Sequence, residues 1–228
     1  MLKIQSLPGF SIALSEKPEG SLRNKEKIIK YLESHQVNKK FCHLSLEHGA
    51  KRIISQKANQ NKLTADAIIS NNNNLCLSLV VADCFPVVII DRKSKAFALI
   101  HAGWRSLVQN IIELTILDMK LHFDSQEKDL FVWIGPGIKN CCYHSKYLPV
   151  QVGMPSWKKS IKQVSTKKWT IDLLKFIKHE FKRLEIDSRH VFADGRCTYC
   201  ENETLFSYRR AQKTKETDGR FLVAVWQD

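Results

Sequence analysis

The sequence has no apolar run long enough to cross a bilayer. No window approaches the roughly 20 uninterrupted apolar residues that a transmembrane helix requires. The first twenty residues, MLKIQSLPGFSIALSEKPEG, lack the long apolar core and the small-residue cleavage site of a signal peptide. No internal repeat or linker-like stretch divides the 228 residues. These absences predict a cytoplasmic protein with no membrane partner and a single domain over residues 1–228.

Signatures of nucleic-acid binding are also missing, although the chain is basic. With 36 Lys and Arg against 23 Asp and Glu, the formal net charge is +13, which favours anionic partners such as phosphate or nucleotides. The simplest interpretation is a lysine-rich surface that keeps the protein in solution. The lysines form no dense run, and there is no zinc finger or RNA-binding motif. We therefore do not expect nucleic acid as the main partner.

The numbers and spacing of the histidines and cysteines limit which metal sites and disulfides they can form. The eight histidines include no His-x-His pair, so they are too few and too scattered for the blue-copper and trinuclear sites of a multicopper oxidase. Seven cysteines, an odd number in a reducing compartment, do not favour a disulfide framework. Most should be small buried hydrophobic residues, with a minority acting as ligands or nucleophiles.

The chain is organised around residues 75–107, LCLSLVVADCFPVVIIDRKSKAFALIHAGWRSL. Three apolar, β-branched runs at Leu75–Val81, Pro86–Ile90 and Ala96–Ile100 predict buried strands. Cys84 and His101 stand at strand ends, 17 residues apart. A strand, a turn and a return strand would place the two side chains next to each other.

Hydrophobic spacing and turn residues predict the remaining elements. Helices are expected over residues 21–36 and 106–123, and from an N-cap at Thr170 to about residue 184. Residues 59–63 should form a polar loop, and residues 150–168 should be irregular. Further strands are expected at residues 41–46, 64–69, 130–134, 190–193, 205–208 and 221–226.

His48, Cys84 and His101 each lie at the end of a predicted strand and could bind one metal ion. Zinc and copper sites use histidine nitrogen and cysteine sulfur, and a catalytic zinc typically has three protein ligands and one open position. The same residues allow a different interpretation, in which Cys84 is a thiolate nucleophile and His101 its base. Asp83 could orient that histidine, but adjacent strand residues point to opposite faces, which argues against a shared pocket.

A second possible metal site uses the remaining paired cysteines. Cys197 and Cys200 have the C-x2-C spacing of a zinc or redox site, and together with Cys141 and Cys142 they would supply four thiolates. Adjacent cysteines do not readily bind one small ion together, which argues against this set.

Two arginine-containing segments are candidates for anion binding. Arg105 follows Gly103 at a predicted helix start, where backbone N–H groups and a guanidinium could hold phosphate. Arg209 and Arg210 follow a predicted strand and form a second candidate. The alternatives are a tight turn with a structural ion pair for Arg105, and a solvated strand end for Arg209 and Arg210.

Several motifs in this order resemble the YfiH/laccase-domain family, whose members were once called multicopper polyphenol oxidases. The most specific combination is ADCFPV at residues 82–87, HAGWR at 101–105 and FSYRR at 206–210. The other matching motifs are EHG at 47–49, ADA at 65–67, GPGI at 135–138, CT at 197–198 and GR at 219–220. The chain departs from the family at Tyr143-His144-Ser145, where Tyr-Glu-Val is usual, and at Thr217-Asp218-Gly219-Arg220, where Thr-Gly-Arg is usual.

The resemblance implies an α/β fold in which β-sheet layers are sandwiched by helices, in the order α-β-β-α. It also implies that His48, Cys84 and His101 bind Zn²⁺, with copper as the other possible metal, and we assign catalytic roles to Cys84, His101 and Arg105. The activity implied is phosphorolysis of adenosine, inosine, guanosine and methylthioadenosine, together with adenosine deamination. Purine nucleosides and phosphate would then be the partners, with Arg105 and Arg209 holding phosphate. The alternatives are copper-dependent polyphenol oxidation and a Cys–His hydrolase that edits muropeptide precursors. The sequence does not fix the oligomeric state, and a monomer is the starting assumption.

Overall fold

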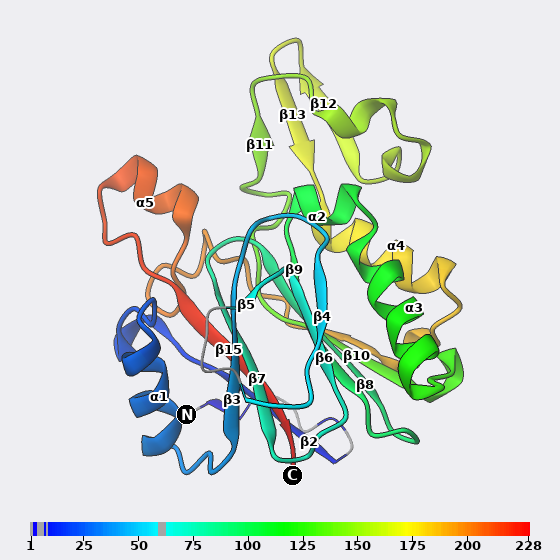
Figure 1. Cartoon of the computed structure of the whole chain (residues 1–228). Coiled ribbons are helices and arrows are strands. Elements are labelled where there is room, and N and C mark those ends of the chain that lie inside the picture. The colour runs from blue at the N-terminus through cyan, green and yellow to red at the C-terminus, as the bar shows by residue number, and fades with distance from the viewer. Residues whose placement is uncertain (1, 4–6, 8, 59–62) are drawn as a thin grey trace.

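The computed structural model describes residues 2–3, 7, 9–58 and 63–228, and it consists mainly of two stacked β-sheets with helices on both outer faces (Figure 1). This α-β-β-α arrangement confirms the predicted fold class. Residues 59–62 of the predicted polar loop lie outside the described part of the chain.

The first sheet has the strand order β1-β2-β15-β7-β3-β5. Strands β3, β5 and β7 are parallel to one another, and the other pairs are antiparallel. The C-terminal ends of β3, β5 and β7 therefore lie at the same edge of the sheet. The strand bounds are β1 Leu2–Lys3, β2 Phe10–Leu14, β3 Lys40–Ser45, β5 Leu63–Thr64, β7 Leu75–Val81 and β15 Phe221–Gln227.

The second sheet has the order β14-β10-β8-β9-β6-β4. Its strands β6, β8, β9 and β10 pair antiparallel, whereas the edge strands β4 and β14 are parallel to their neighbours. The bounds are β4 Arg52–Ile54, β6 Ala67–Ser70, β8 Phe85–Asp91, β9 Phe97–Ala102, β10 Leu130–Ile134 and β14 Val191–Ala193.

Three connections at one end of the sandwich lead the chain from the first sheet to the second. The connections β3–β4, β5–β6 and β7–β8 each leave the first sheet and enter the second. The single strand predicted at residues 64–69 is therefore wrong: β5 and β6 belong to different sheets and are separated by Ala65-Asp66. Alternation of apolar and polar residues could not reveal this crossing, because residues 65–70, which include the crossing itself, are all buried.

Strand alternation divides the apolar residues between an inner core and two outer layers. From β8, Val88 and Ile90 enter the core between the sheets, whereas Val87 and Ile89 face the helices. The outer face of the first sheet is covered by α1 (Lys25–Ser34), which buries Ile28 and Leu32 against Leu222 and Ala224 of β15. Helix α1 begins at Asn24, whose side chain accepts the N–H of Glu26 at 2.8 Å.

The outer face of the second sheet is covered by α2 (Trp104–Val108), α3 (Ile111–Phe123) and α4 (Leu173–Arg183). The continuous helix predicted over residues 106–123 is wrong because Asn110 adopts a left-handed conformation, with φ of 59°, and starts a new helix. The N-cap of α4 is Asp172, whose carboxylate accepts the N–H of Lys175 at 2.9 Å, and not Thr170, which lies in a strand. No helix in the described residues is long and apolar enough to span a membrane.

A small three-stranded sheet stands apart from the sandwich at the top of Figure 1. It has the order β11-β13-β12, and it places β12 and the first residue of β13 where residues 150–168 were predicted to be irregular. Its strands are β11 His144–Ser145, β12 Ile161–Ser165 and β13 Lys168–Ile171. The short 3-10 helices of the chain are Lys17–Glu19, Glu127–Asp129, Val150–Gly153, Pro155–Trp157 and Ser188–His190.

The last helix, α5 (Tyr208–Thr214), replaces the strand predicted at residues 205–208. Leu205 and Phe206 are buried by tertiary packing and have no strand partner. Ser207 caps the helix by accepting the N–H of Arg210 at 3.2 Å. Arg209 consequently projects from the first turn of a helix.

Candidate metal centre and the surrounding pocket

The three sheet-to-sheet crossings bring His48, Cys84 and His101 together. His48 lies in the β3–β4 connection, Cys84 lies in the β7–β8 connection, and His101 is the penultimate residue of β9. One donor atom of each residue lies within 4.8 Å of the others, and the two imidazole rings meet edge to face with centroids 4.8 Å apart. The sequence prediction that these three residues meet is thus matched by the geometry.

Asp66, in the β5–β6 crossing, holds both histidines in place. Its fully buried carboxylate accepts the Nδ1–H of His101 at 2.8 Å and the backbone N–H groups of His48 and Gly49 at 2.9 and 2.7 Å. Burial raises the pKa of Asp66, but these hydrogen bonds outweigh burial and leave the pKa lowered. With Nδ1 of His101 occupied, Nε2 is the ring nitrogen that remains for a ligand or for Cys84.

The pKa values of the two histidines shift in opposite directions. Burial lowers the pKa of His101, but the Cys84 thiolate and the Asp66 carboxylate raise it overall to about 9. The pKa of His48 is lowered, first by burial and then by the positive charges of His101, Arg105 and Arg220, against the opposing effect of Asp66.

The donor set fits a metal ion of the zinc or copper class. Two imidazoles and a thiolate are ligands that Zn²⁺ accepts, and three protein ligands leave one coordination position for a substrate. The carboxylate behind His101 is the usual partner of a metal-binding imidazole. Gly103 keeps the centre open, because a Cβ at this position would lie 3.0 Å from Sγ of Cys84 and 3.4 Å from Cε1 of His101.

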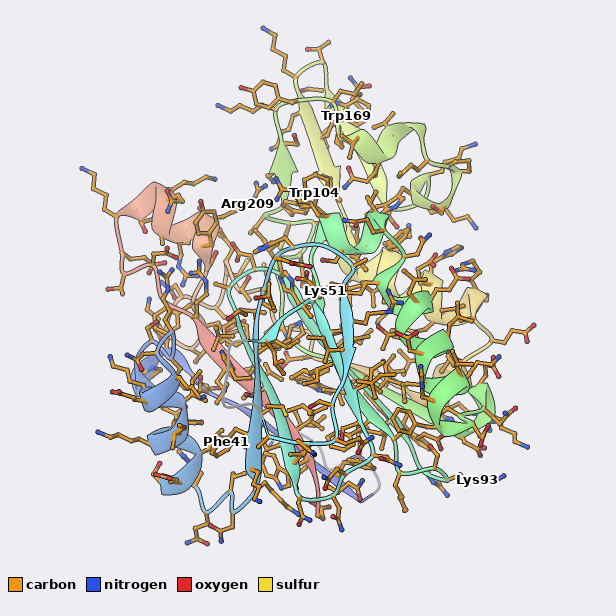
Figure 2. All side chains as sticks on the ribbon, in the orientation of Figure 1. Phe41, Lys51, Lys93, Trp104, Trp169 and Arg209 are labelled. Atoms are coloured by element: carbon orange, nitrogen blue, oxygen red, sulfur yellow. The ribbon has the colours of Figure 1, made fainter. Side chains whose placement is uncertain are left out.

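A cavity of about 440 Å³ opens beside these three residues. Three arginines line it, each next to an aromatic side chain that also lines it. The Arg105 guanidinium lies 4.5 Å from the Trp104 ring, Arg209 lies 4.4 Å from Tyr143, and Arg220 lies 5.6 Å from Tyr208. Figure 2 shows Trp104 and Arg209 at the same end of the molecule. Stacking on a ring restricts a guanidinium without using its N–H groups.

The two predicted anion-binding arginines have different surroundings. Arg105 is exposed at the cavity wall. Arg209 is half-buried and donates from Nη1 to the carbonyl oxygen of His144 at 2.8 Å. Burial raises the pKa of Tyr143, beneath Arg209, to about 12, and the positive charges of Arg209 and Arg105 oppose that rise.

Arg210, which the sequence paired with Arg209 as an anion clamp, is structural. Its buried guanidinium donates to the carbonyl oxygens of Thr198, Tyr199 and Leu205 at 2.6–2.9 Å and pairs with Glu216. Arg220 was named only as part of a motif, yet it lines the cavity and pairs with Asp218. A glycine–arginine motif carries no signal by which sequence reasoning could have placed it there.

Asp83 does not orient His101, because Asp66 has that position. Its carboxylate points the other way: Oδ1 accepts the Thr198 hydroxyl at 2.7 Å, and Oδ2 accepts the backbone N–H of Arg209 at 2.8 Å. Asp83 adopts a left-handed backbone conformation, with φ of 86°. The residue next to Cys84 therefore fixes the start of α5 and, with it, Arg209.

These features define a two-sheet α/β protein with a His–Cys–His centre beside an arginine-lined pocket. A model of the family described as multi-copper polyphenol oxidoreductase laccase matches residues 9–228. The chain belongs to this family, which confirms the resemblance in the sequence motifs.

Similar proteins of known name and structure agree with this assignment. A purine nucleoside phosphorylase from Clostridium acetobutylicum is 31% identical over 172 residues, which cover 75% of this chain and 72% of the relative. One from Bacteroides thetaiotaomicron is 30% identical, over 84% of this chain and 71% of the relative. The crystal structure of YlmD from Geobacillus stearothermophilus superposes with a TM-score of 0.82 at 20% identity, over 96% of this chain and 92% of that one. Protein NMB0706 from Neisseria meningitidis gives 0.81 at 21% identity, over 98% and 96% of the two chains. These structures show the shared fold.

Proposed function

We propose that the protein is a zinc-dependent purine nucleoside enzyme. It cleaves adenosine, inosine, guanosine and methylthioadenosine with phosphate, and it deaminates adenosine. The observation that carries this proposal is the cavity itself, in which three arginine–aromatic pairs face a His–Cys–His centre. The names of the two relatives at 30–31% identity support the substrate class.

The volume of the cavity and the arginines that line it suit phosphorolysis of a nucleoside. Its volume of about 440 Å³ lies within the range of about 300–1,000 Å³ typical of small-molecule sites. In phosphorolysis, a phosphate oxygen bonds to the anomeric carbon of the sugar, and the glycosidic C–N bond breaks with its electron pair leaving on the purine. Arg105 and Arg209 would hold and orient the phosphate, since a guanidinium binds phosphate oxygens through paired N–H groups.

His48, Cys84 and His101 would hold the zinc ion, with Asp66 fixing the ring of His101. When bound, zinc supplies a Lewis acid that activates water near neutral pH, the chemistry that deamination of adenosine needs. The raised pKa of His101 reflects the negative Cys84 and Asp66 beside it, and the same negative charges favour a bound cation.

A multicopper oxidase mechanism is not favoured by the ligands that this chain offers. In the described residues, the groups of three or more metal-ligating side chains that come together are the His–Cys–His centre and a set of four cysteines. Neither resembles a trinuclear histidine cluster. We expect polyphenol oxidation, the activity in the family description, to be weak or adventitious.

One observation favours a second candidate, a cysteine hydrolase that edits muropeptide precursors. Cys84, His101 and Asp66 are arranged as a nucleophile, a base and a carboxylate that orients the base. A hydrolase of this kind would form a covalent substrate adduct on Cys84 and would act without metal. His48 has no role in such a mechanism but completes a metal site, and for that reason we rank the hydrolase second.

A nucleoside panel tests the proposal. Purified zinc-loaded protein is incubated with each of the four nucleosides, with and without phosphate, and base, ribose-1-phosphate and ammonia are measured. We expect base release that depends on phosphate and matches formation of the sugar-1-phosphate, which is ribose-1-phosphate, or 5-methylthioribose-1-phosphate from methylthioadenosine. We also expect phosphate-independent conversion of adenosine to inosine. Absence of turnover on every nucleoside, together with a covalent Cys84 adduct or robust copper-dependent phenol oxidation, would replace the proposal with the corresponding alternative.

Replacing Arg105 with alanine should separate the two activities. We expect the apparent phosphate KM to rise by about 10- to 100-fold, because a hydrogen bond to a charged group contributes about 1.5–3 kcal/mol, while deamination is largely spared. Arg92→Ala is a matched control, since Arg92 also stacks on an aromatic ring, Phe131 at 5.3 Å, and does not line the cavity. Equal loss of both activities in Arg105→Ala, with metal content and folding intact, would mean that Arg105 serves the common site and not phosphate binding.

A further inference from the structure

Four cysteines outside the pocket converge from two distant segments. Cys141 and Cys142 lie in the turn after β10, and Cys197 and Cys200 lie after β14; we call these four residues the thiol cluster. Their sulfur atoms all lie within 4.8 Å of one another. None of the four lines the cavity beside His48, Cys84 and His101. The structure thus assembles a set that sequence reasoning considered improbable, because two of its members are adjacent.

The spacing of the sulfur atoms matches a tetrahedral metal site. Sγ of Cys200 lies 3.4 Å from Sγ of Cys142 and 3.9 Å from Sγ of Cys141. A tetrahedron with zinc–sulfur bonds of about 2.3 Å has sulfur–sulfur edges of about 3.8 Å. The turn at Lys139–Tyr143, closed by hydrogen bonds from the N–H groups of Cys142 and Tyr143 to the Lys139 carbonyl, presents both adjacent thiols to Cys200. The usual objection to adjacent cysteine ligands therefore does not apply to this backbone.

Backbone N–H groups around Cys197 favour a thiolate at that position. The N–H of Lys139 donates to Sγ of Cys197 at 3.4 Å. Burial raises the pKa of Cys197, but this bond and those from the N–H groups of Cys200 and Tyr199 lower it overall. The C-x2-C segment is itself a tight turn, in which the N–H groups of Cys200 and Glu201 bond to the Cys197 carbonyl at 3.0 and 2.9 Å.

The negative charge of Cys197 opposes ionisation of its neighbours Cys141 and Cys142. The pKa values of Cys141 and Cys142 are raised, first by burial and also by the negative charge of Cys197. A divalent cation reverses this effect, because metal binding releases the thiol protons and neutralises the sulfur charges. Cys141 and Cys200 are exposed, so an ion can reach the cluster from solvent.

We propose that the thiol cluster is a structural Zn²⁺ site with four cysteine ligands, separate from the His–Cys–His centre. Four thiolates fill the coordination sphere of zinc and leave no position for substrate, so the site has a structural role. The zinc would tie together two segments that end at the pocket. One continues into Tyr143, which packs under Arg209, and the other contains Thr198, which donates to Asp83.

Metal counting tests the site without relying on any activity. We expect two zinc ions per wild-type chain after purification with reductant and without chelator, and one in Cys197→Ser/Cys200→Ser. Cys76→Ser is the control, since Cys76 is fully buried and lies outside the thiol cluster, and it should keep both ions. In Cys84→Ala, X-ray absorption should show the remaining zinc with sulfur ligands alone, at about 2.3 Å.

A second measurement uses the wild-type protein and does not depend on whether a variant folds. Native protein is alkylated with and without prior chelation, and the modified cysteines are mapped by peptide mass. We expect the thiol cluster to be protected until zinc is removed. Immediate alkylation of the exposed Cys141 and Cys200 with only one zinc per chain would overturn the proposal. It would also be overturned by a Cys142–Cys200 disulfide in freshly reduced protein, or by nitrogen or oxygen ligands on the zinc of Cys84→Ala.

Discussion

Replacing Cys84 with alanine should remove one metal ion per chain and reduce nucleoside turnover by at least about 100-fold. Loss of a residue that merely orients a ligand typically costs 10- to 100-fold in metal affinity or activity, and loss of a ligand itself should cost more. Cys84 supplies the only sulfur of the His–Cys–His centre, and its interaction with His101 is among the causes that raise the pKa of that histidine. Metal content is measured by elemental analysis and turnover by base release, and we expect His48→Ala and His101→Ala to behave in the same way.

The control for Cys84→Ala is Cys76→Ala, which removes a thiol buried between the first sheet and α1. This variant should keep its metal and its turnover, with a small loss of stability from the cavity. Full zinc retention at the His–Cys–His centre in all three ligand variants would show that these residues do not form the metal site. Loss of metal from His48→Ala without loss of nucleoside turnover would show that the reaction does not need the metal.

Replacing Asp66 with alanine should weaken the metal centre and the fold together. Three donors would lose their acceptor: the ring Nδ1–H of His101 and the backbone N–H groups of His48 and Gly49. We expect metal affinity to fall by about 10- to 100-fold. We also expect the free energy of unfolding to fall by about 1–3 kcal/mol, because the buried ring N–H of His101 is left without an acceptor. Zinc affinity is measured by chelator competition and stability by urea unfolding of the metal-free protein.

Asp66→Asn removes the negative charge of this residue and keeps its size and shape, so it separates the effects of the two. The amide keeps the size of the carboxylate and one acceptor oxygen, but its NH₂ group would face a backbone N–H. We expect both metal affinity and stability to lie between those of the wild type and Asp66→Ala. If Asp66→Ala bound zinc as tightly as the wild type, the orientation of His101 would have to come from another source.

The central strands were predictable because their sequence alone requires burial. Residues 75–81 and 130–134 form strands with the predicted bounds. Strand β8 extends its predicted run by one residue at each end, and β9 begins one residue later and ends two residues later than predicted. The proximity of Cys84 and His101 was equally accessible, since β8 and β9 pair antiparallel with Pro86 opposite His101. The single-domain boundary over residues 1–228 and the catalytic roles of Cys84, His101 and Arg105 stay predictions.

The predictions of helices and strands were wrong where tertiary contacts, and not the periodicity of apolar residues, determine the structure. Helical spacing runs through residues 106–123 without a break, so it could not reveal the left-handed Asn110 between α2 and α3. Leu205 and Phe206 are apolar and buried, and they were interpreted as a strand although Ser207 has the chemistry of a helix cap. The crossing at Asp66 was hidden because residues 65–70 are buried without a break.

The parts of the site that could not be predicted from the sequence depend on contacts between residues that are distant in the chain. Asp66 was part of a named motif without a role, and only the three connections between the sheets show that it supports both histidines. The two halves of the thiol cluster are 58 residues apart at their closest contact, so neither segment indicates the other. The same holds for Arg220, whose place at the cavity depends on β15 lying beside β7.

Asp83 illustrates how two unrelated demands can restrict a position to one amino acid. The backbone demand, a φ of 86°, is met readily by glycine and tolerated by asparagine and aspartate. The side-chain demand is for two acceptor oxygens, one for the Thr198 hydroxyl and one for the Arg209 N–H. Glycine satisfies the first demand and offers no acceptor, and asparagine turns one acceptor into a donor. Glutamate has both oxygens, but it extends them by one carbon and resists the left-handed backbone. Aspartate satisfies both demands as the Thr198 hydroxyl stands, and asparagine would do so only if that hydroxyl turned to accept from the amide. The identity of this one residue is therefore tied to the orientation of a hydroxyl more than one hundred positions away in the chain.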